Sequence, residues 1–129
     1  MTKPVTVLHV RNSVIIGGPE TTLLGWLNHI DKNEFHCPLA LFQNSGGVEL
    51  PFRTECEKLN IPILDIPWGN RKSFVQAYQR LVTLIREQNV QILHTHDWRS
   101  DVIGYYAAKK TGIPIMTTVY VWFYRPFKI

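Results

Sequence analysis

Short apolar runs alternate with segments of helical periodicity along nearly the whole chain, and this alternation constrains the fold most. The first run, 5–10, is rich in β-branched residues and fits a strand buried on both faces. Further apolar runs occupy 38–42, 61–66, 90–94 and 114–121. Strands that alternate with helices form βαβ units, which require a parallel sheet with right-handed crossovers. We therefore predict a Rossmann-like α/β fold, an open parallel sheet of at least five strands with helices on both faces.

The clearest predicted helix follows Ser73. Its apolar positions recur at i, i+4, i+7 and i+11 as Phe74, Tyr78, Leu81 and Ile85. Other helices are predicted from Thr21, over 51–59 and over 101–110, and Gly112 is expected to end the last one in the left-handed conformation. Gly25 is expected to let the first helix approach the sheet closely.

The size and composition predict a single domain over residues 1–129, because 45% of the 129 residues are hydrophobic and no linker or repeat interrupts them. The only two cysteines, Cys37 and Cys56, indicate a reducing compartment rather than a disulfide framework. The sequence has neither a secretory signal pattern nor an apolar run of about 18 residues. We therefore expect a cytoplasmic protein.

The positive charge is spread along the chain. The formal net charge is +4, yet the 14 Lys and Arg residues form only two adjacent pairs, Arg71-Lys72 and Lys109-Lys110. A nucleic-acid footprint would cluster on one face, so we expect no nucleic-acid partner. An attraction to anionic membranes or to phosphate-bearing ligands fits the composition better.

Ligands of open α/β sheets bind at the carboxyl ends of the strands. The loop after the first strand carries Gly17-Gly18, which allows a ligand close to the backbone and offers amide groups to a phosphate at the helix start. The same pair also suits a plain turn. It is neither G-x-G-x-x-G nor a P-loop, so a dinucleotide or Walker-type site lacks its motif. Glu20, just after the pair, is typical of an acid at a helix N-terminus.

The loop after the fourth run contains His94-Thr95-His96-Asp97-Trp98-Arg99. Strand alternation places His94 and His96 on one side of the strand, and such a pair could bind a metal in a hydrolase. No other histidine or carboxylate has the sequence spacing to complete that site, so we predict no metal. Packing suits His94, whereas the position of His96 near the strand end suits a ligand contact. The loop after the fifth run ends at Tyr120, which could bond a ligand or shield the strand.

These loops carry a family resemblance. VLHV, GGPETTLL, LNIPILDIP and ILHTHDWRSDVIGYYAAKKTGIPIMTTV occur in that order between Val5 and about Trp122. The stretch resembles the N-terminal domain of family-4 retaining glycosyltransferases, which have the GT-B fold. The resemblance implies an acceptor-binding domain that works with a C-terminal domain holding the nucleotide-sugar donor. That second domain is absent from these residues, so we expect the chain to be a fragment, or a subunit with a separate partner, and inactive alone.

The resemblance also implies site residues. Gly17 and Gly18 would approach the donor phosphates or the acceptor, and His96, Asp97 and Arg99 would line the cleft floor. Tyr120 stands where the family has the histidine of a T-V-H-G pattern, and its phenol can still bond a sugar hydroxyl. A sugar or lipid-linked acceptor and a peripheral membrane contact are implied partners, with no cofactor.

Two other functions compete with sugar transfer. The chain could be a non-enzymatic Rossmann-like interaction module or a partner subunit, because the fifth strand would be an exposed edge beside an aromatic tail of Trp122, Phe123, Tyr124 and Phe127. That edge predicts a homodimer. The remaining alternative is a metal-dependent hydrolase that uses His94 and His96.

Overall fold

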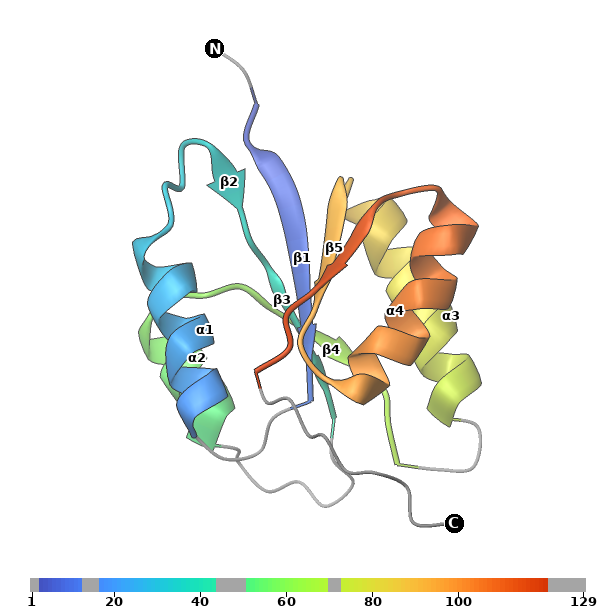
Figure 1. Ribbon diagram of the computed structural model, residues 1–129, viewed down its shortest axis with the longest axis horizontal. Coiled ribbons are helices and arrows are strands. Elements are labelled where there is room, and N and C mark those ends of the chain that lie inside the picture. The colour runs from blue at the N-terminus through green and yellow to red at the C-terminus, as the bar shows by residue number, and fades with distance from the viewer. Residues whose placement is uncertain (1–2, 13–16, 44–50, 70–72, 121–129) are drawn as a thin grey trace.

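Six strands form one sheet in the order β4-β3-β1-β5-β6, with β2 beside β1 (Figure 1). The computed structural model describes residues 3–12, 17–43, 51–69 and 73–120. The strands are β1 (Val5–Arg11), β2 (Phe35–His36), β3 (Leu39–Phe42), β4 (Ile63–Ile66), β5 (Ile92–Thr95) and β6 (Ile115–Thr117). Every strand pair is parallel, which confirms the predicted fold class.

Helices cover both faces of the sheet. Figure 1 shows α1 (Gly18–His29) and α2 (Pro51–Lys58) on one side, and α3 (Ser73–Glu87) and α4 (Trp98–Thr111) on the other. Strand alternation in β3 supplies both cores, because Leu39 and Leu41 pack with α1 and α2 while Ala40 and Phe42 pack with α3 and α4. Among the described residues, no helix combines the length and apolarity needed to cross a bilayer.

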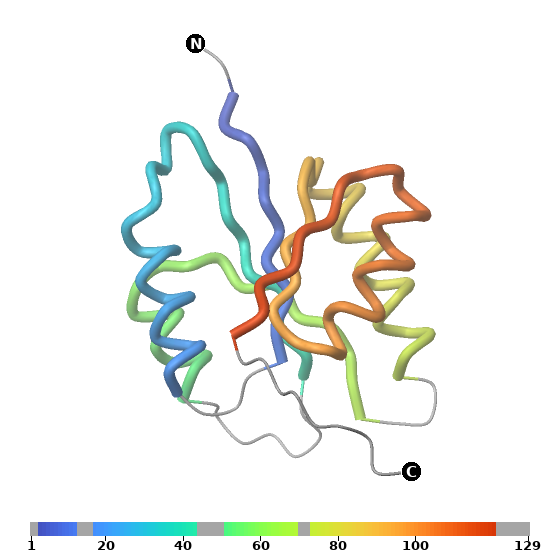
Figure 2. Tube along the Cα trace, in the orientation of Figure 1, coloured from blue at the N-terminus to red at the C-terminus, as the bar shows by residue number. Residues whose placement is uncertain are grey.

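The loops after β1, β5 and β6 are neighbours, because these three strands are adjacent in the sheet and run in the same direction. In Figure 2 the traces of β1, β5 and β6 end at the same side of the domain. Residues that follow these strands therefore share one edge, which we call the rim.

Several element boundaries differ from the sequence prediction, and three of the differences bear on the architecture. The two-residue β2 was not predicted, and its parallel pairing with the start of β1 depends on tertiary contact rather than on a long apolar run. Strand β6 covers only 115–117, although Thr118 N still donates to Thr95 O at 3.1 Å. Helix α4 begins earlier than predicted, at Trp98, because Asp97 caps it, and Gly112 ends it at φ 75° as predicted.

The edge position of β6 agrees with the sequence expectation. The aromatic tail proposed to accompany that edge in a homodimer lies outside the described residues. The dimer therefore stays a prediction.

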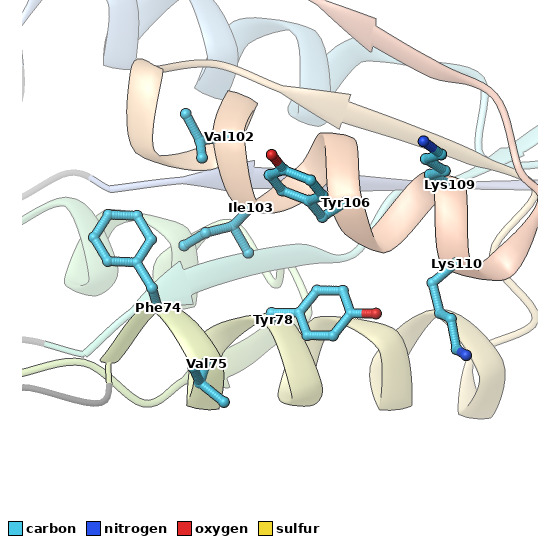
Figure 3. A pocket seen from close by; sticks show the side chains of 8 residues that line it. All are labelled: Phe74, Val75, Tyr78, Val102, Ile103, Tyr106, Lys109 and Lys110. Atoms are coloured by element: carbon cyan, nitrogen blue, oxygen red, sulfur yellow. The ribbon is translucent and has the colours of Figure 1, made fainter.

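A second surface feature is a groove between the outer sides of α3 and α4 (Figure 3).

Gly104, rather than Gly25, is the close contact between a helix and the sheet. A Cβ at Gly25 would meet nothing within 4 Å, so the expectation for that residue is wrong. A Cβ at Gly104 in α4 would lie 2.7 Å from Thr95 Cγ2. Thr95 has little freedom to move, because its hydroxyl donates to Asp101 Oδ1 at 2.7 Å and the residue is fully buried.

Replacing Gly104 by alanine should therefore destabilise the fold. We expect Gly104→Ala to lower the free energy of unfolding by about 1–3 kcal/mol, because overpacking against the sheet outweighs the helix propensity of alanine. Gly25→Ala is the matched control and should raise stability by up to about 1 kcal/mol. Urea denaturation measures both variants. A Gly104→Ala domain as stable as the parent would contradict the close packing of α4.

Candidate functional site

Two polar side chains, His9 and Arg11, are buried in the central strand β1. Central strands of doubly covered sheets are usually apolar throughout, so these two residues need partners. The parallel register places His9 opposite His94 in β5. The side chains of His9 and Arg11 therefore reach the residues that follow β5, at the rim.

Three aromatic side chains form a hydrogen-bonded chain at the rim. His9 Nδ1 lies 2.8 Å from His96 Nε2, and His96 Nδ1 lies 2.8 Å from the Tyr120 hydroxyl. A neutral imidazole has one donor and one acceptor nitrogen, so the hydrogens of this chain can be arranged in either direction. The orientation of the Tyr120 hydroxyl is thus linked to His9, which lies in β1 two residues before the end of that strand.

The histidines of this chain are held neutral. Burial, together with the repulsion that a protonated His94 would exert, lowers the pKa of His9 to about 3. Burial also lowers the pKa of His96 to about 2, assisted by repulsion from His94, His9 and Arg11. A neutral His96 can accept a hydrogen bond as well as donate one, which an imidazolium cannot do.

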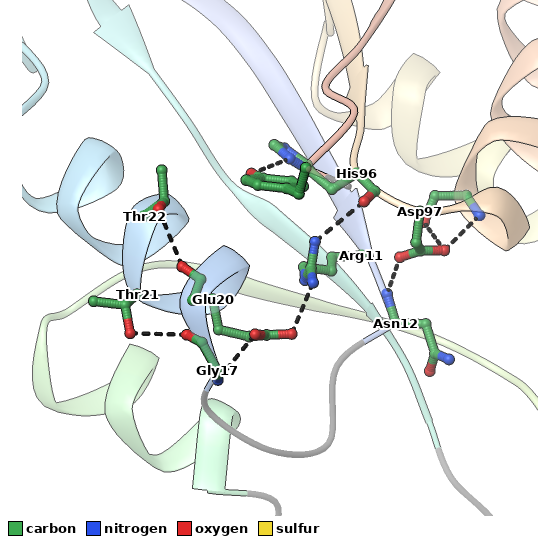
Figure 4. A network of polar contacts seen from close by, with 11 residues as sticks. Arg11, Asn12, Gly17, Glu20, Thr21, Thr22, His96 and Asp97 are labelled. Atoms are coloured by element: carbon green, nitrogen blue, oxygen red, sulfur yellow. Dashed lines mark hydrogen bonds and ion pairs between the residues drawn. The ribbon is translucent and has the colours of Figure 1, made fainter. Parts of the chain in front are cut away.

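Arg11 connects three segments of the rim (Figure 4). Its Nη2 donates to Glu20 Oε1 at 2.7 Å, and its Nη1 donates to the His96 carbonyl oxygen at 3.1 Å. The guanidinium carbon also lies 5.2 Å from the centre of the Tyr120 ring. Arg11 therefore fixes α1 and the loop after β5 relative to β1.

Glu20 does more than complement the helix dipole. Its second oxygen accepts from the amide of Gly17 at 3.0 Å, so this helix-start amide already has an anionic partner. Burial alone would raise the pKa of Glu20, but the hydrogen bond and positive charge of Arg11 outweigh it and lower the pKa. The carboxylate is therefore ionised in a buried ion pair.

Asp97 uses both carboxylate oxygens to connect two elements (Figure 4). Oδ1 accepts from Ser100 N at 3.0 Å and caps α4. Oδ2 accepts from Asn12 N at 2.7 Å, at the end of β1. The role of Asp97 in the structure is thus to join the carboxyl end of β1 to the start of α4.

Two buried polar atoms near the rim have no hydrogen-bond partner within the described part of the chain, Asn12 Oδ1 and Arg99 Nε. The guanidinium of Arg99 lies 4.1 Å from the ring centre of Trp68, on the side of the sheet covered by α3 and α4. Buried polar atoms in native proteins are nearly always bonded. Both atoms are therefore candidates for contact with a ligand.

The cross-strand register corrects the expectation that no third histidine accompanies His94 and His96. The ring nitrogens of His9, His94 and His96 lie within 4.8 Å of one another. Two imidazole ligands on a tetrahedral zinc stand about 3.3 Å apart, given bonds of about 2.0 Å. His9 and His96 are closer, at 2.8 Å, and the rings of His94 and His96 are stacked with centres 4.2 Å apart. This arrangement is a hydrogen-bonded cluster, and a metal would require the rings to turn.

An apolar groove of about 620 Å³ runs beside the histidines, between α1 and β6. His9 and His94 line its sheet side, and Trp26 and Gly25 line its helix side. His94 also bonds Thr118, with 2.6 Å between Nε2 and Oγ1. His94 thus has the packed, hydrogen-bonded environment that the sequence suggested.

The structure brings together four of the six predicted site residues, namely Gly17, His96, Asp97 and Tyr120, through Arg11, Glu20 and Asn12. Arg99 also follows β5, but it packs against Trp68 on the side of α3 and α4 and makes none of these hydrogen bonds, and Gly18 begins α1. The binding roles of all six residues stay predictions. Sequence reasoning missed His9 and Arg11, although two polar residues inside a central apolar strand were a usable signal.

Comparison with known proteins places this geometry in context. The sequence profile of Glycosyltransferase Family 4 matches residues 16–128. Comparison with curated protein sequences gives no significant match.

Three solved structures share the fold. A glycosyltransferase from Rickettsia africae is 20% identical with a TM-score of 0.76, and covers 98% of this chain and 32% of its own. HepE from Anabaena, solved with UDP and glucose, is 17% identical with a TM-score of 0.61, and the coverages are 84% and 28%. A UDP-N-acetylglucosamine 2-epimerase is 18% identical with a TM-score of 0.60, with coverages of 90% and 33%. The chain thus spans about a third of each structure, and at these identities the likeness shows the fold alone.

The buried histidines make the stability of the fold depend on pH. An unfolded histidine takes up a proton near pH 6.5, whereas the pKa values of folded His9 and His96 are about 3 and about 2. The unfolded state therefore binds more protons in this window. We expect the free energy of unfolding to fall as the pH is lowered from about 6.5 and to be fully regained above it, as measured by urea denaturation.

His9→Gln removes one of these groups and should reduce the slope between about pH 6.5 and about pH 4.5, where ordinary carboxyl groups are still largely ionised. His36→Gln is the control for the substitution itself, because it replaces an exposed histidine in β2. A slope in His9→Gln equal to that of the parent chain would show that His9 does not resist protonation.

Proposed function

Because the chain belongs to glycosyltransferase family 4, we propose that it is the acceptor-binding half of an enzyme that transfers a sugar from a nucleotide-sugar donor to an acceptor. The hydrogen-bonded series of Tyr120, His96 and His9 at the rim carries this proposal. It presents an oriented hydroxyl at the carboxyl ends of the strands, where α/β sheets bind ligands. The family match supports sugar transfer in general. The activity, the donor class, the acceptor and the division of labour together are the proposal.

Tyr120 has the role of a sugar-binding group in this proposal. Its hydroxyl is in contact with a neutral His96, so it can donate to a sugar oxygen while it accepts from His96 Nδ1, or the reverse. Burial raises the pKa of Tyr120, which keeps the phenol protonated. A protonated phenol next to a neutral imidazole suits a ligand made of hydroxyl groups.

Arg11 is a positioning residue in this proposal. Its charge is matched by Glu20 and its second donor group holds the His96 carbonyl. Besides the Tyr120 hydroxyl, the buried atoms Asn12 Oδ1 and Arg99 Nε are candidates for ligand contact, because neither has a partner in the described residues. An acceptor hydroxyl could donate to Asn12 Oδ1, and an acceptor oxygen could accept from Arg99 Nε.

The donor is proposed to bind mainly to a second domain. HepE, solved with UDP and glucose, supports a nucleotide-sugar donor, and the chain spans 28% of that structure. Retention of the anomeric configuration, implied by the sequence resemblance, would depend on stabilising the leaving diphosphate, which we assign to the second domain. Gly17 contributes little to binding a diphosphate, because its amide already bonds Glu20. A dimer through the β6 edge remains a proposal beside this function.

The division of labour predicts weak nucleotide binding by this chain. We expect calorimetry to give a dissociation constant for UDP or GDP of about 1 mM or weaker, because few groups at the rim are suited to a diphosphate. The complete two-domain enzyme should bind one of the two at least tenfold more tightly. Micromolar binding by these 129 residues would overturn the proposed division.

Removing the Tyr120 hydroxyl should impair transfer. In the complete enzyme we expect Tyr120→Phe to lower kcat/KM about tenfold, the effect of losing one hydrogen bond of about 1.4 kcal/mol. Tyr105→Phe, on the exposed side of α4, is the matched control and should keep full activity. Thermal unfolding of both variants checks the fold. Unchanged kcat/KM in Tyr120→Phe would exclude Tyr120 from the sugar site.

A further inference from the structure

The hydrogen-bonded series of Tyr120, His96 and His9 has two ends. Its outer end is the Tyr120 hydroxyl at the rim. Its inner end is Nε2 of His9, because the other ring nitrogen, Nδ1, faces His96. Within the described part of the chain His9 Nε2 has no hydrogen-bond partner, and His9, which is 4% exposed, lines the groove of about 620 Å³ between α1 and β6. The series therefore connects the rim to that groove.

The hydrogens of this series can take two arrangements, because each neutral imidazole carries one hydrogen. In the inward arrangement the Tyr120 hydroxyl donates to His96 Nδ1, His96 Nε2 donates to His9 Nδ1, and the hydrogen of His9 is on Nε2. In the outward arrangement both hydrogen bonds are reversed, and His9 Nε2 carries no hydrogen. The nitrogen and oxygen atoms need not move. The inward arrangement thus becomes the outward one when a proton enters at Tyr120 and another leaves from His9.

The carboxylates of the described rim are poorly suited to take up a proton. Glu20 accepts from Arg11 and from the Gly17 amide, and Asp97 accepts from two backbone amides. A carboxylate that is hydrogen-bonded in its ionised form is a weaker base. The hydrogen-bonded series is instead uncharged, and its outer end is the hydroxyl assigned to the sugar site.

We propose that Tyr120, His96 and His9 conduct the proton of the acceptor hydroxyl from the rim to the groove during sugar transfer. This inference rests on the proposed function. The acceptor oxygen bonds the anomeric carbon as the bond from that carbon to the diphosphate oxygen breaks, and the leaving diphosphate keeps the bonding electrons. The acceptor proton passes to the Tyr120 oxygen, each hydrogen of the series moves one place inward, and His9 Nε2 releases a proton to water in the groove.

Weakly basic histidines suit this task. The acceptor oxygen gains positive charge as its new bond forms, so its proton becomes acidic enough for a weak general base to accept. Burial lowers the pKa of His96 to about 2 and that of His9 to about 3, so neither ring retains the proton as an imidazolium. After the product leaves, the reverse shift returns a proton to His9 from the groove, releases one from Tyr120 to water at the rim, and restores the inward arrangement.

His9→Asn separates proton conduction from orientation. The asparagine oxygen can accept from His96 Nε2 and so keep Tyr120 oriented, but an amide does not pass the proton on. In the complete two-domain enzyme, with UDP-glucose or GDP-mannose as donor and water as acceptor, we expect His9→Asn to lower kcat about tenfold or more and to leave KM for the donor within about twofold. His36→Asn, in an exposed position of β2, is the control and should retain both parental values.

Rates in mixtures of H2O and D2O give a second readout. The kcat of the parent enzyme should depend on the deuterium fraction along a curve, because several protons move together, and that of His9→Asn should depend on it linearly. A parental kcat or a parental curvature in His9→Asn would overturn proton conduction and leave sugar transfer intact. No turnover by the parent enzyme with either donor would contradict the proposed function, and this inference with it.

Nitrogen-15 NMR of the 129-residue chain tests the series without a donor and without a variant that must fold. We expect the Nε2–H tautomer at both His9 and His96, or its rapid exchange with the other tautomer. A permanent Nδ1–H tautomer at His96 would overturn the inference, because such a ring donates to Tyr120 and cannot take up a proton from the rim.

Discussion

The buried guanidinium of Arg11 is the interaction on which the rim depends. A buried charge is costly unless it is both paired and hydrogen-bonded, and Arg11 has the Glu20 carboxylate on one side and the His96 carbonyl on the other. Removing Arg11 or Glu20 alone would leave an uncompensated charge inside the domain. The ion pair therefore specifies how α1 and the loop after β5 meet β1, more than it adds to overall stability. The hydrogen bond from Arg11 to the His96 carbonyl positions the loop that carries His96.

The histidine chain has the opposite electrostatic character. His9 and His96 are neutral because they are buried and because Arg11 and His94 stand nearby, so the rim combines one compensated ion pair with uncharged donors and acceptors. Uncharged groups in fixed positions suit a ligand made of hydroxyls, where specificity comes from the direction of each hydrogen bond. The hydrogen bond from His96 to Tyr120 extends this fixed arrangement of donors and acceptors toward the surface.

The sequence predicted the features that depend on local pattern. Apolar runs identified five strands, and their parallel direction followed from the helices between them. It did not predict that His9 lies beside His94, because this contact depends on the order of the strands in the sheet and on the register of β1 with β5. The same limitation hid the partner of Glu20, which looked like an ordinary acid at a helix start. Gly104 was missed for a similar reason, since its contact with Thr95 is tertiary.

The two bonds of Asp97 have a mechanical consequence. One carboxylate oxygen holds the end of β1 and the other holds the first turn of α4, so the strand and the helix cannot slide past each other without breaking a charge-assisted bond. Gly104 adds to this rigidity by seating α4 directly on β5. Asp97 and Gly104 together therefore fix the start of α4 against β1 and β5, and the backbone beside His96 is held at the same place. The spacing between the polar groups of Asn12, Arg11 and His96 at the rim is thus set by the contact of one strand with one helix.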